Sequence, residues 1–308
     1  MKKKPWVKWS GRLGKTVLGC LLVSQVMTGF TLFGGSESKV EAAEPLVVST
    51  WMWNPFVIEK DQDITLQHLM DQRINRVYLN IDLDYLAIDY SSFIRKAKAK
   101  GIEVQALGGA PNWVLPEHNK KMYEFIDWVK QYNNSVQPEE RFTGIHLDVE
   151  PYVLTQWRQD SDAVIGLWMD TVSGFAEEVK ADSDLTVGID MPTWLDSIRV
   201  RDGYGGMTTL PEWLISRLDQ VTLMAYFDNA DNISQSVQDE INAADRVGVP
   251  VLVAVDTVNS GEVGGSFFNK GQVLMRNELA AVVGSLGDHP SFEGYSVHDW
   301  DSWMKLGQ

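Results

Sequence analysis

The sequence is poor in cysteine and has far fewer basic residues than acidic ones. Its 308 residues include one cysteine, and 27 lysines and arginines stand against 42 aspartates and glutamates. Because the cysteine, Cys20, lies near the N-terminus, we expect the folded domain to contain no disulfide and no thiol chemistry. Phosphate backbones are bound through Lys and Arg, so the acidic excess argues against nucleic acid as a partner.

Histidine is also scarce, and its spacing gives no metal-binding motif. The five histidines include no paired ligands of the kind that hold zinc. Calcium prefers a cluster of oxygen ligands, and no loop has the dense Asp and Asn spacing of a dedicated calcium site. We therefore predict no metal and no cofactor.

Basic and apolar residues are concentrated at the N-terminus. Three lysines follow Met1, an apolar run covers residues 16–33, and the small-residue sequence Val40-Glu41-Ala42 comes next. This order predicts a signal peptide over residues 1–42. We expect residues 43–308 to be secreted, outside the cell or on its surface, with no stable membrane insertion. An uncleaved anchor is the alternative, because the run approaches the roughly 17 to 25 residues that span a bilayer.

Short β-rich runs alternate with segments of helical periodicity through the rest of the chain. We predict strands at 46–53, 76–82, 103–108, 144–150, 185–191, 220–227, 250–258 and 292–300. Helices are expected at 64–73, 91–100, 120–132, 162–181, 211–218, 233–247 and 270–286. These repeats predict an α/β fold, a single-domain (β/α)8 TIM barrel over residues 43–308. An open doubly wound sheet is the main alternative.

The fourth predicted strand carries ionisable side chains on one face. Residues 145, 147 and 149 are apolar and share one face, whereas His146, Asp148 and Glu150 share the other. In a β/α barrel the apolar face meets the helices, and catalytic groups lie at the C-terminal ends of the strands. The pattern therefore predicts a catalytic strand. Two neighbouring carboxylates also raise one pKa, which keeps a proton on Glu150 for acid catalysis.

Other polar and aromatic residues gather at the C-terminal ends of the predicted strands. Polar side chains at inward positions include Asp82, Asp190, Tyr226, Asp228 and Asp256. Tryptophans at the same end are Trp51, Trp53, Trp113, Trp157, Trp194, Trp300 and Trp303. Aromatic faces stack on sugars while hydroxyls need polar partners, so the set predicts a carbohydrate site. Any one tryptophan by itself would indicate ordinary core packing.

Four short motifs together resemble family 18 of the glycoside hydrolases, the chitinase-like barrels. The fourth strand of that family ends in Asp-x-Glu, to which residues 148–150 are similar. The family's small-Gly-Gly turn, Met-x-Tyr and final-strand tryptophan are similar to Leu107-Gly108-Gly109-Ala110, Met224-Ala225-Tyr226 and Trp300. The matches follow the family's order and cover essentially the whole predicted domain.

The resemblance implies a role for each matching residue. Glu150 would protonate the leaving glycosidic oxygen and then activate water, and Asp148 would orient the 2-acetamido group of the substrate. That acetamido group is the nucleophile in this family, so no second carboxylate attacks the sugar. Tyr226 would hydrogen-bond the acetamido oxygen, and Trp300 would form the floor beneath the sugar.

The implied partner is a polysaccharide or glycan that contains N-acetylglucosamine: chitin, peptidoglycan or a protein-linked glycan. We expect it to be bound by Trp300, Trp51, Trp113, Trp194, Asp228, Asp190 and His146. Only residues 259–291 separate the last two strands, so the insertion domain of many chitinases has no room. We expect a monomer.

The fourth strand departs from the family's pattern at Thr143 and His146, where the family has aspartates. His146 either hydrogen-bonds Asp148 within the site or fills the lower barrel by bonding a neighbour. Two other functions stay open. One is a barrel that binds sugars without cleaving them. The other is a glycosidase that uses Asp190 or Asp228 as a second carboxylate on a substrate without an acetamido group, with carboxyl groups roughly 5 to 5.5 Å apart.

Overall fold

The computed structural model describes residues 46–83 and 85–307, and the predicted signal peptide lies outside them. Eight parallel strands close into a barrel in the order β1-β10-β9-β8-β5-β4-β3-β2. They are β1 (Val47–Met52), β2 (Arg76–Asn80), β3 (Glu103–Gly108), β4 (Gly144–Leu147), β5 (Thr186–Pro192), β8 (Gln220–Met224), β9 (Val251–Asp256) and β10 (Phe292–His298). Each coincides with a predicted run, so the (β/α)8 barrel is confirmed and the open sheet is excluded.

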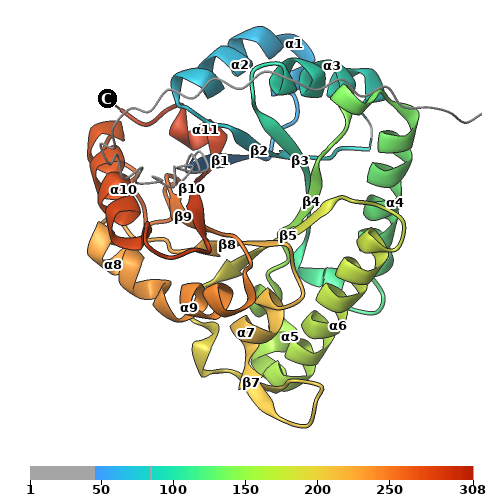
Figure 1. Ribbon diagram of the computed structural model, residues 1–308, viewed down its shortest axis with the longest axis vertical. Coiled ribbons are helices and arrows are strands. Elements are labelled where there is room, and N and C mark those ends of the chain that lie inside the picture. Colours follow the sequence, from blue (N-terminus) through green and yellow to red (C-terminus); the bar gives the residue numbers. More distant parts are fainter. Residues whose placement is uncertain (1–45, 84, 308) are drawn as a thin grey trace, which may run out of the picture. The chain divides into compact units, whose positions relative to one another are not determined.

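A ring of helices surrounds the barrel (Figure 1). They are α1 (Val57–Lys60), α2 (Gln62–Asp71), α3 (Ala87–Lys98), α4 (Lys120–Ser135), α5 (Thr155–Gln159), α6 (Ser161–Lys180), α7 (Leu210–Ile215), α8 (Ala230–Ser236), α9 (Gln238–Val247), α10 (Gln272–Leu286) and α11 (Trp300–Trp303). The helix predicted over 233–247 is divided in two, because the backbone of Val237 leaves the helical region between α8 and α9. Between β9 and β10 the described chain adds only α10, so the predicted lack of an insertion domain holds.

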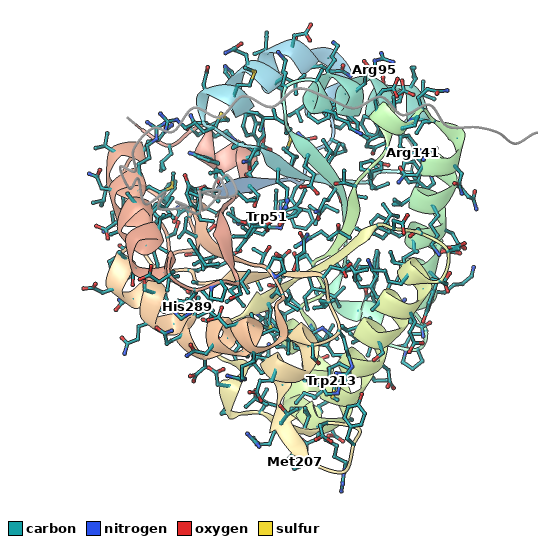
Figure 2. The ribbon with its side chains drawn as sticks, in the orientation of Figure 1. Trp51, Arg95, Arg141, Met207, Trp213 and His289 are labelled. Atoms are coloured by element: carbon teal, nitrogen blue, oxygen red, sulfur yellow. The ribbon has the colours of Figure 1, made fainter. Side chains whose placement is uncertain are left out.

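Several short elements were not predicted, among them α1, α5, α11 and a small hairpin between β5 and α7. Strands β6 (Arg199–Arg201) and β7 (Met207–Thr209) pair antiparallel. Met207 marks this hairpin at the lower edge of Figure 2, away from the barrel. Strands of three residues are too short to give a period-2 signal, so sequence patterns could not reveal it.

Apolar side chains form a large core outside the barrel and a small one inside it. Ile145 and Leu147 of β4 are buried in the outer core, against the helices. The inner core contains Trp51, Tyr78, Leu107, Leu252 and Ala254. The alternation predicted for the fourth strand is therefore confirmed, since its apolar residues face out and His146 faces in.

Ionic and amide groups fill the N-terminal half of the barrel. Arg76 is bound by Glu103 at 2.8 Å and by Glu293 at 2.9 Å. Above this ion pair, Gln105 and Gln220 hydrogen-bond one another across the interior. These contacts make the interior a packed core, which leaves the C-terminal ends of the strands as the place for chemistry. In the described part of the chain, no helix combines the length and apolarity that crossing a membrane requires.

Candidate active site

Asp148 and Glu150 directly follow β4, at the C-terminal end of the barrel. Burial, followed by the charges of Asp190 and Glu150, raises the pKa of Asp148 well above its ordinary value. Oδ1 of Asp148 is buried and has no hydrogen-bond partner among the described residues. This carboxyl group is therefore held in surroundings that favour its protonated form, or that await a donor from a bound molecule.

Glu150 has a partner of its own. The hydroxyl of Tyr152 donates a hydrogen bond of 2.6 Å to Oε1 of Glu150. Burial raises the pKa of Glu150, the hydrogen bond from Tyr152 and the charge of His298 lower it, and the charge of Asp190 raises it, with a net upward shift. A raised pKa was predicted, but burial contributes more to it than repulsion between carboxylates does.

The backbone of Asp148 is held against the turn after β3. The amide of Asp148 donates to the carbonyl of Gly108 at 3.0 Å. Gly109 has φ +153°, and a Cβ on it would lie 1.9 Å from the carbonyl oxygen of Asp148. Only glycine allows this approach. The Gly-Gly pair singled out in the sequence therefore sets the position of the first acid.

Tyr226 follows β8 and lies beside the acids. Burial and then the charges of Asp190 and Asp148 raise the pKa of Tyr226 well above its ordinary value. The phenol therefore keeps its proton and can donate a hydrogen bond. Glu150, Asp148 and Tyr226 thus lie together at the end of the barrel, and burial raises the pKa of all three.

His146, Asp190 and Trp51 lie beneath this group, inside the barrel. The imidazole of His146 stacks on Tyr78 with ring centroids 3.9 Å apart. Its Nε2 lies 2.9 Å from Oδ1 of Asp190, but out of line for a hydrogen bond. Oδ2 of Asp190 accepts a hydrogen bond of 3.0 Å from Nε1 of Trp51, and Figure 2 shows Trp51 in the middle of the barrel.

This placement corrects three expectations. We expected His146, Asp190 and Trp51 to bind substrate, yet their exposed fractions are 0%, 2% and 1%. A buried indole offers no face to a sugar, and a buried carboxylate has no route to a hydroxyl. His146 fills the lower barrel, as in the second of the two possibilities, but it does so by stacking on Tyr78 and without the expected hydrogen bond to a neighbour.

Trp300 also lies elsewhere than expected. It begins α11 after β10 has ended, is 5% exposed, and packs in the core outside the barrel. The expected floor for a sugar would need a free aromatic face, which Trp300 does not have. The last inward residue of β10 is His298, which sequence reasoning did not single out, although the alternation from Ser296 places it inward.

His298 contacts three residues at the end of the barrel. Its Nδ1 lies 3.0 Å from Oδ1 of Asp256, and its Nε2 accepts from Nε1 of Trp53 at 3.2 Å. Its ring is nearly parallel to that of Tyr226, with centroids 5.9 Å apart and planes at 29°. The site therefore contains an imidazole where the resemblance implied an indole.

The remaining predicted residues lie toward the rim. Trp194 is 50% exposed, and its ring meets those of Tyr152 and Trp157 edge to face. Trp113 is half-buried beside Phe125. Of these tryptophans, Trp194 offers the largest free face.

Asp228, the last of the predicted residues, is paired with Lys270. Its Oδ2 lies 3.0 Å from Nζ of Lys270. This hydrogen-bonded pair lowers the pKa of Asp228, so the side chain is a carboxylate near neutral pH. Across residues 46–83 and 85–307, no three His, Cys, Asp or Glu side chains are grouped to hold a metal ion.

Solved structures of chitinases share this fold. The chitinase from Bacteroides thetaiotaomicron is 10% identical with a TM-score of 0.52, over 83% of this chain and 90% of that one. The GH18 chitinase from Cycas revoluta in complex with (GlcNAc)3 is 11% identical with a TM-score of 0.52, over 84% and 96%. ICChI chitinase from Ipomoea carnea is 11% identical with a TM-score of 0.50, over 83% and 96%. The likeness establishes a chitinase-like TIM barrel, as predicted. No family model matches the sequence, and no curated protein does.

Proposed function

We propose that this protein is a secreted glycoside hydrolase that cleaves glycans containing N-acetylglucosamine. The observation that carries the proposal is Glu150, a carboxyl group with a raised pKa, two residues after Asp148 and beside the protonated phenol of Tyr226. Two features that favour acid catalysis are thereby present, a pKa raised by burial and a position at the C-terminal end of the barrel. The similar chitinase structure that holds (GlcNAc)3 supports the choice of sugar.

The proposed reaction proceeds in two steps. Glu150 gives its proton to the glycosidic oxygen while the acetamido carbonyl oxygen of the substrate attacks C1, so the glycosidic bond breaks and a cyclic intermediate forms. Asp148, which as a whole residue is half-buried, accepts the acetamido N–H, and Tyr226 donates to the acetamido oxygen. Glu150 then takes a proton from water as the water attacks C1 and opens the ring.

The alternative with two protein carboxylates is less well supported. Asp190 is 2% exposed and is bound by Trp51, and Asp228 is paired with Lys270. Neither is free to attack a sugar carbon. A sugar-binding barrel without catalysis remains the second candidate, because His146 replaces an acid of the family's motif.

The test is the variant Glu150→Gln, with hydrolysis of chitin oligomers, peptidoglycan fragments and N-glycans followed by intact mass. We expect a folded variant with a loss of about 100-fold to 10,000-fold in kcat, the usual contribution of general acid catalysis. Glu117→Gln, at an exposed position, is the control and should keep full activity. Wild-type protein that binds these glycans without cleaving any would favour the second candidate.

A thiazoline that mimics the cyclised acetamido group tests substrate assistance separately. We expect it to inhibit cleavage competitively. Cleavage that this compound leaves untouched would exclude substrate assistance.

Secretion and the monomeric state belong to the same proposal. Expression of the full chain should release a protein whose N-terminal residue is Ala43. Light scattering should give the mass of one mature chain. A retained precursor of full mass would support the uncleaved anchor instead.

A further inference from the structure

His298 lies between two side chains that restrict where its protons can be. On one side, Nδ1 lies 3.0 Å from the carboxylate of Asp256. On the other, Nε2 lies 3.2 Å from the indole Nε1 of Trp53. The Asp256 side chain is 7% exposed and that of His298 is 26% exposed, so solvent reaches the imidazole but scarcely reaches its anionic partner.

The chemistry of these partners fixes the tautomer. An indole N–H is only a donor, so the bond from Trp53 requires a lone pair on Nε2. A carboxylate is only an acceptor, so the contact with Asp256 requires a proton on Nδ1. Both contacts are satisfied together only by a neutral imidazole with its proton on Nδ1. A second proton, on Nε2, would bring two donors face to face.

We propose that His298 is a positioning residue that holds Trp53 at the end of the barrel through the hydrogen bond from the indole N–H to Nε2. Protonation of Nε2 breaks this hydrogen bond and leaves the indole N–H free to bind a sugar oxygen. This inference deepens the proposed function, on which its sugar-binding part rests. The hydrogen bond itself can be tested without any substrate.

The surroundings move this change to a higher pH than that of a free imidazole. Burial disfavours the imidazolium, but the hydrogen bond to Asp256 and the charges of Asp256, Asp299 and Asp190 outweigh it, so the pKa of His298 is raised above 6.5. The other titratable groups that face this part of the site are Glu150 after β4 and Tyr226 after β8. Trp51, whose ring meets the imidazole at 70° with centroids 5.5 Å apart, carries no charge.

The geometry also explains why the freed indole would meet substrate. Trp53 follows β1 and is half-buried, and it packs on the inner core that contains Trp51 and contacts Tyr226. The ring of Tyr226 lies nearly parallel to the imidazole, with centroids 5.9 Å apart. Of the two partners of His298, the half-buried Trp53 is less enclosed than Asp256, whose side chain is 7% exposed.

The experiment is a pH titration by NMR of the mature protein between about pH 5 and pH 9. It follows the ring nitrogens of His298 and the indole Nε1–H of Trp53, which Trp53→Phe identifies. We expect the Nδ1–H tautomer at high pH and a Trp53 signal that shifts with the same midpoint as His298. Asp256→Asn should lower that midpoint, and His298→Phe should abolish the pH dependence of the Trp53 signal.

A matched control exists outside the site. His289 is also paired with an aspartate, Asp245, at 2.7 Å, so His289→Phe removes a comparable imidazole and should leave the Trp53 titration unchanged. An Nε2–H tautomer at high pH would overturn the proposal. A Trp53 signal that does not titrate, or one that still titrates in His298→Phe, would overturn it as well.

Binding of chitotriose to Glu150→Gln tests the role in sugar recognition. Protonation of His298 should tighten the Kd about fivefold, the value of one additional hydrogen bond, and His298→Phe should remove this pH dependence. A Kd that stays constant while the Trp53 signal titrates would overturn the proposed contact between the Trp53 indole and the sugar. Failure to bind chitotriose at any pH would count against the proposed function. The hydrogen bond between His298 and Trp53 is tested separately, by the NMR titration.

Discussion

The hydroxyl of Tyr152 donates a 2.6 Å hydrogen bond to Oε1 of Glu150. Glu150 directly precedes the short 3-10 helix over Pro151–Val153 that contains Tyr152. Hydrogen bonding to a carboxylate favours its charged form. Tyr152 therefore opposes the burial that raises the pKa of Glu150.

Replacing Tyr152 by Phe should move the alkaline limit of activity upward. Without the donor, the pKa of Glu150 rises further, so the acid form persists to higher pH. We expect the alkaline limb of kcat/KM on a chitin oligomer to shift up by at least several tenths of a pH unit, with a lower maximum. Tyr204→Phe, at a residue that is 96% exposed, is the control. A downward shift would contradict the assignment.

Replacing Asp148 by Asn should stabilise the fold while reducing activity. The pKa of Asp148 is higher in the folded state, so the folded state binds its proton more tightly and loses stability as pH rises above the ordinary carboxyl range. Asparagine carries no such charge. We expect the free energy of unfolding in urea to exceed that of the wild type by about 1–3 kcal/mol near neutral pH. The difference should vanish at acid pH.

Asp288→Asn serves as the control for this measurement, because Asp288 is exposed. It should change the free energy of unfolding little at any pH. An Asp148→Asn variant that is less stable than the wild type near neutral pH would show that the charged form has a partner in the fold.

Replacing Gly109 by Ala should lower both the free energy of unfolding and the activity. A Cβ at this position would lie 1.9 Å from the carbonyl oxygen of Asp148, so β3 and β4 would have to separate. We expect a loss of about 1–3 kcal/mol or more in unfolding free energy, together with reduced activity. Gly166→Ala is the matched control: this helical glycine has nothing within 4 Å of its added Cβ, and it should gain about 0.4–1 kcal/mol.

The burial of Glu240, on α9, predicts a second pH dependence of the stability of the fold, outside the site. It is 1% exposed, and its carboxyl group interacts with that of Asp196. Burial, and then the charge of Asp196, raise its pKa to about 9. Because the folded state holds this proton more tightly, stability should fall as pH rises from about 4.5 to about 9.

Glu240→Gln should remove this slope of stability against pH. It should also raise the free energy of unfolding at pH 9 by about 1–3 kcal/mol. Thermal melts across the pH range give the measurement. Asp196→Asn should keep part of the slope and move it to lower pH, since the repelling charge is gone. Equal slopes in the wild type and in Glu240→Gln would contradict the assignment.

Local sequence determined much of this protein. Period-2 alternation placed Ile145, Leu147 and Val149 against the helices and the ionisable residues of β4 inside, because side chains of a strand point to opposite faces whatever the rest of the fold does. The alternation of eight β-rich runs with helical segments predicted the barrel. The glycine pair at Gly108 and Gly109 was likewise visible in sequence.

Only the tertiary structure decided how deeply each inward side chain is buried and at which residue each strand ends. Asp148 and Asp190 follow the same inward alternation, but only the tertiary structure shows that Asp190 is 2% exposed and is bound by Nε1 of Trp51. Trp300 comes two residues after His298, so strand alternation alone would point it into the barrel. Instead the strand ends and Asp299 caps α11 by accepting from the amide of Ser302 at 2.9 Å. Trp300 therefore faces the outer core. Alternation fixes a direction only while the strand lasts, and where a strand ends depends on contacts far along the chain.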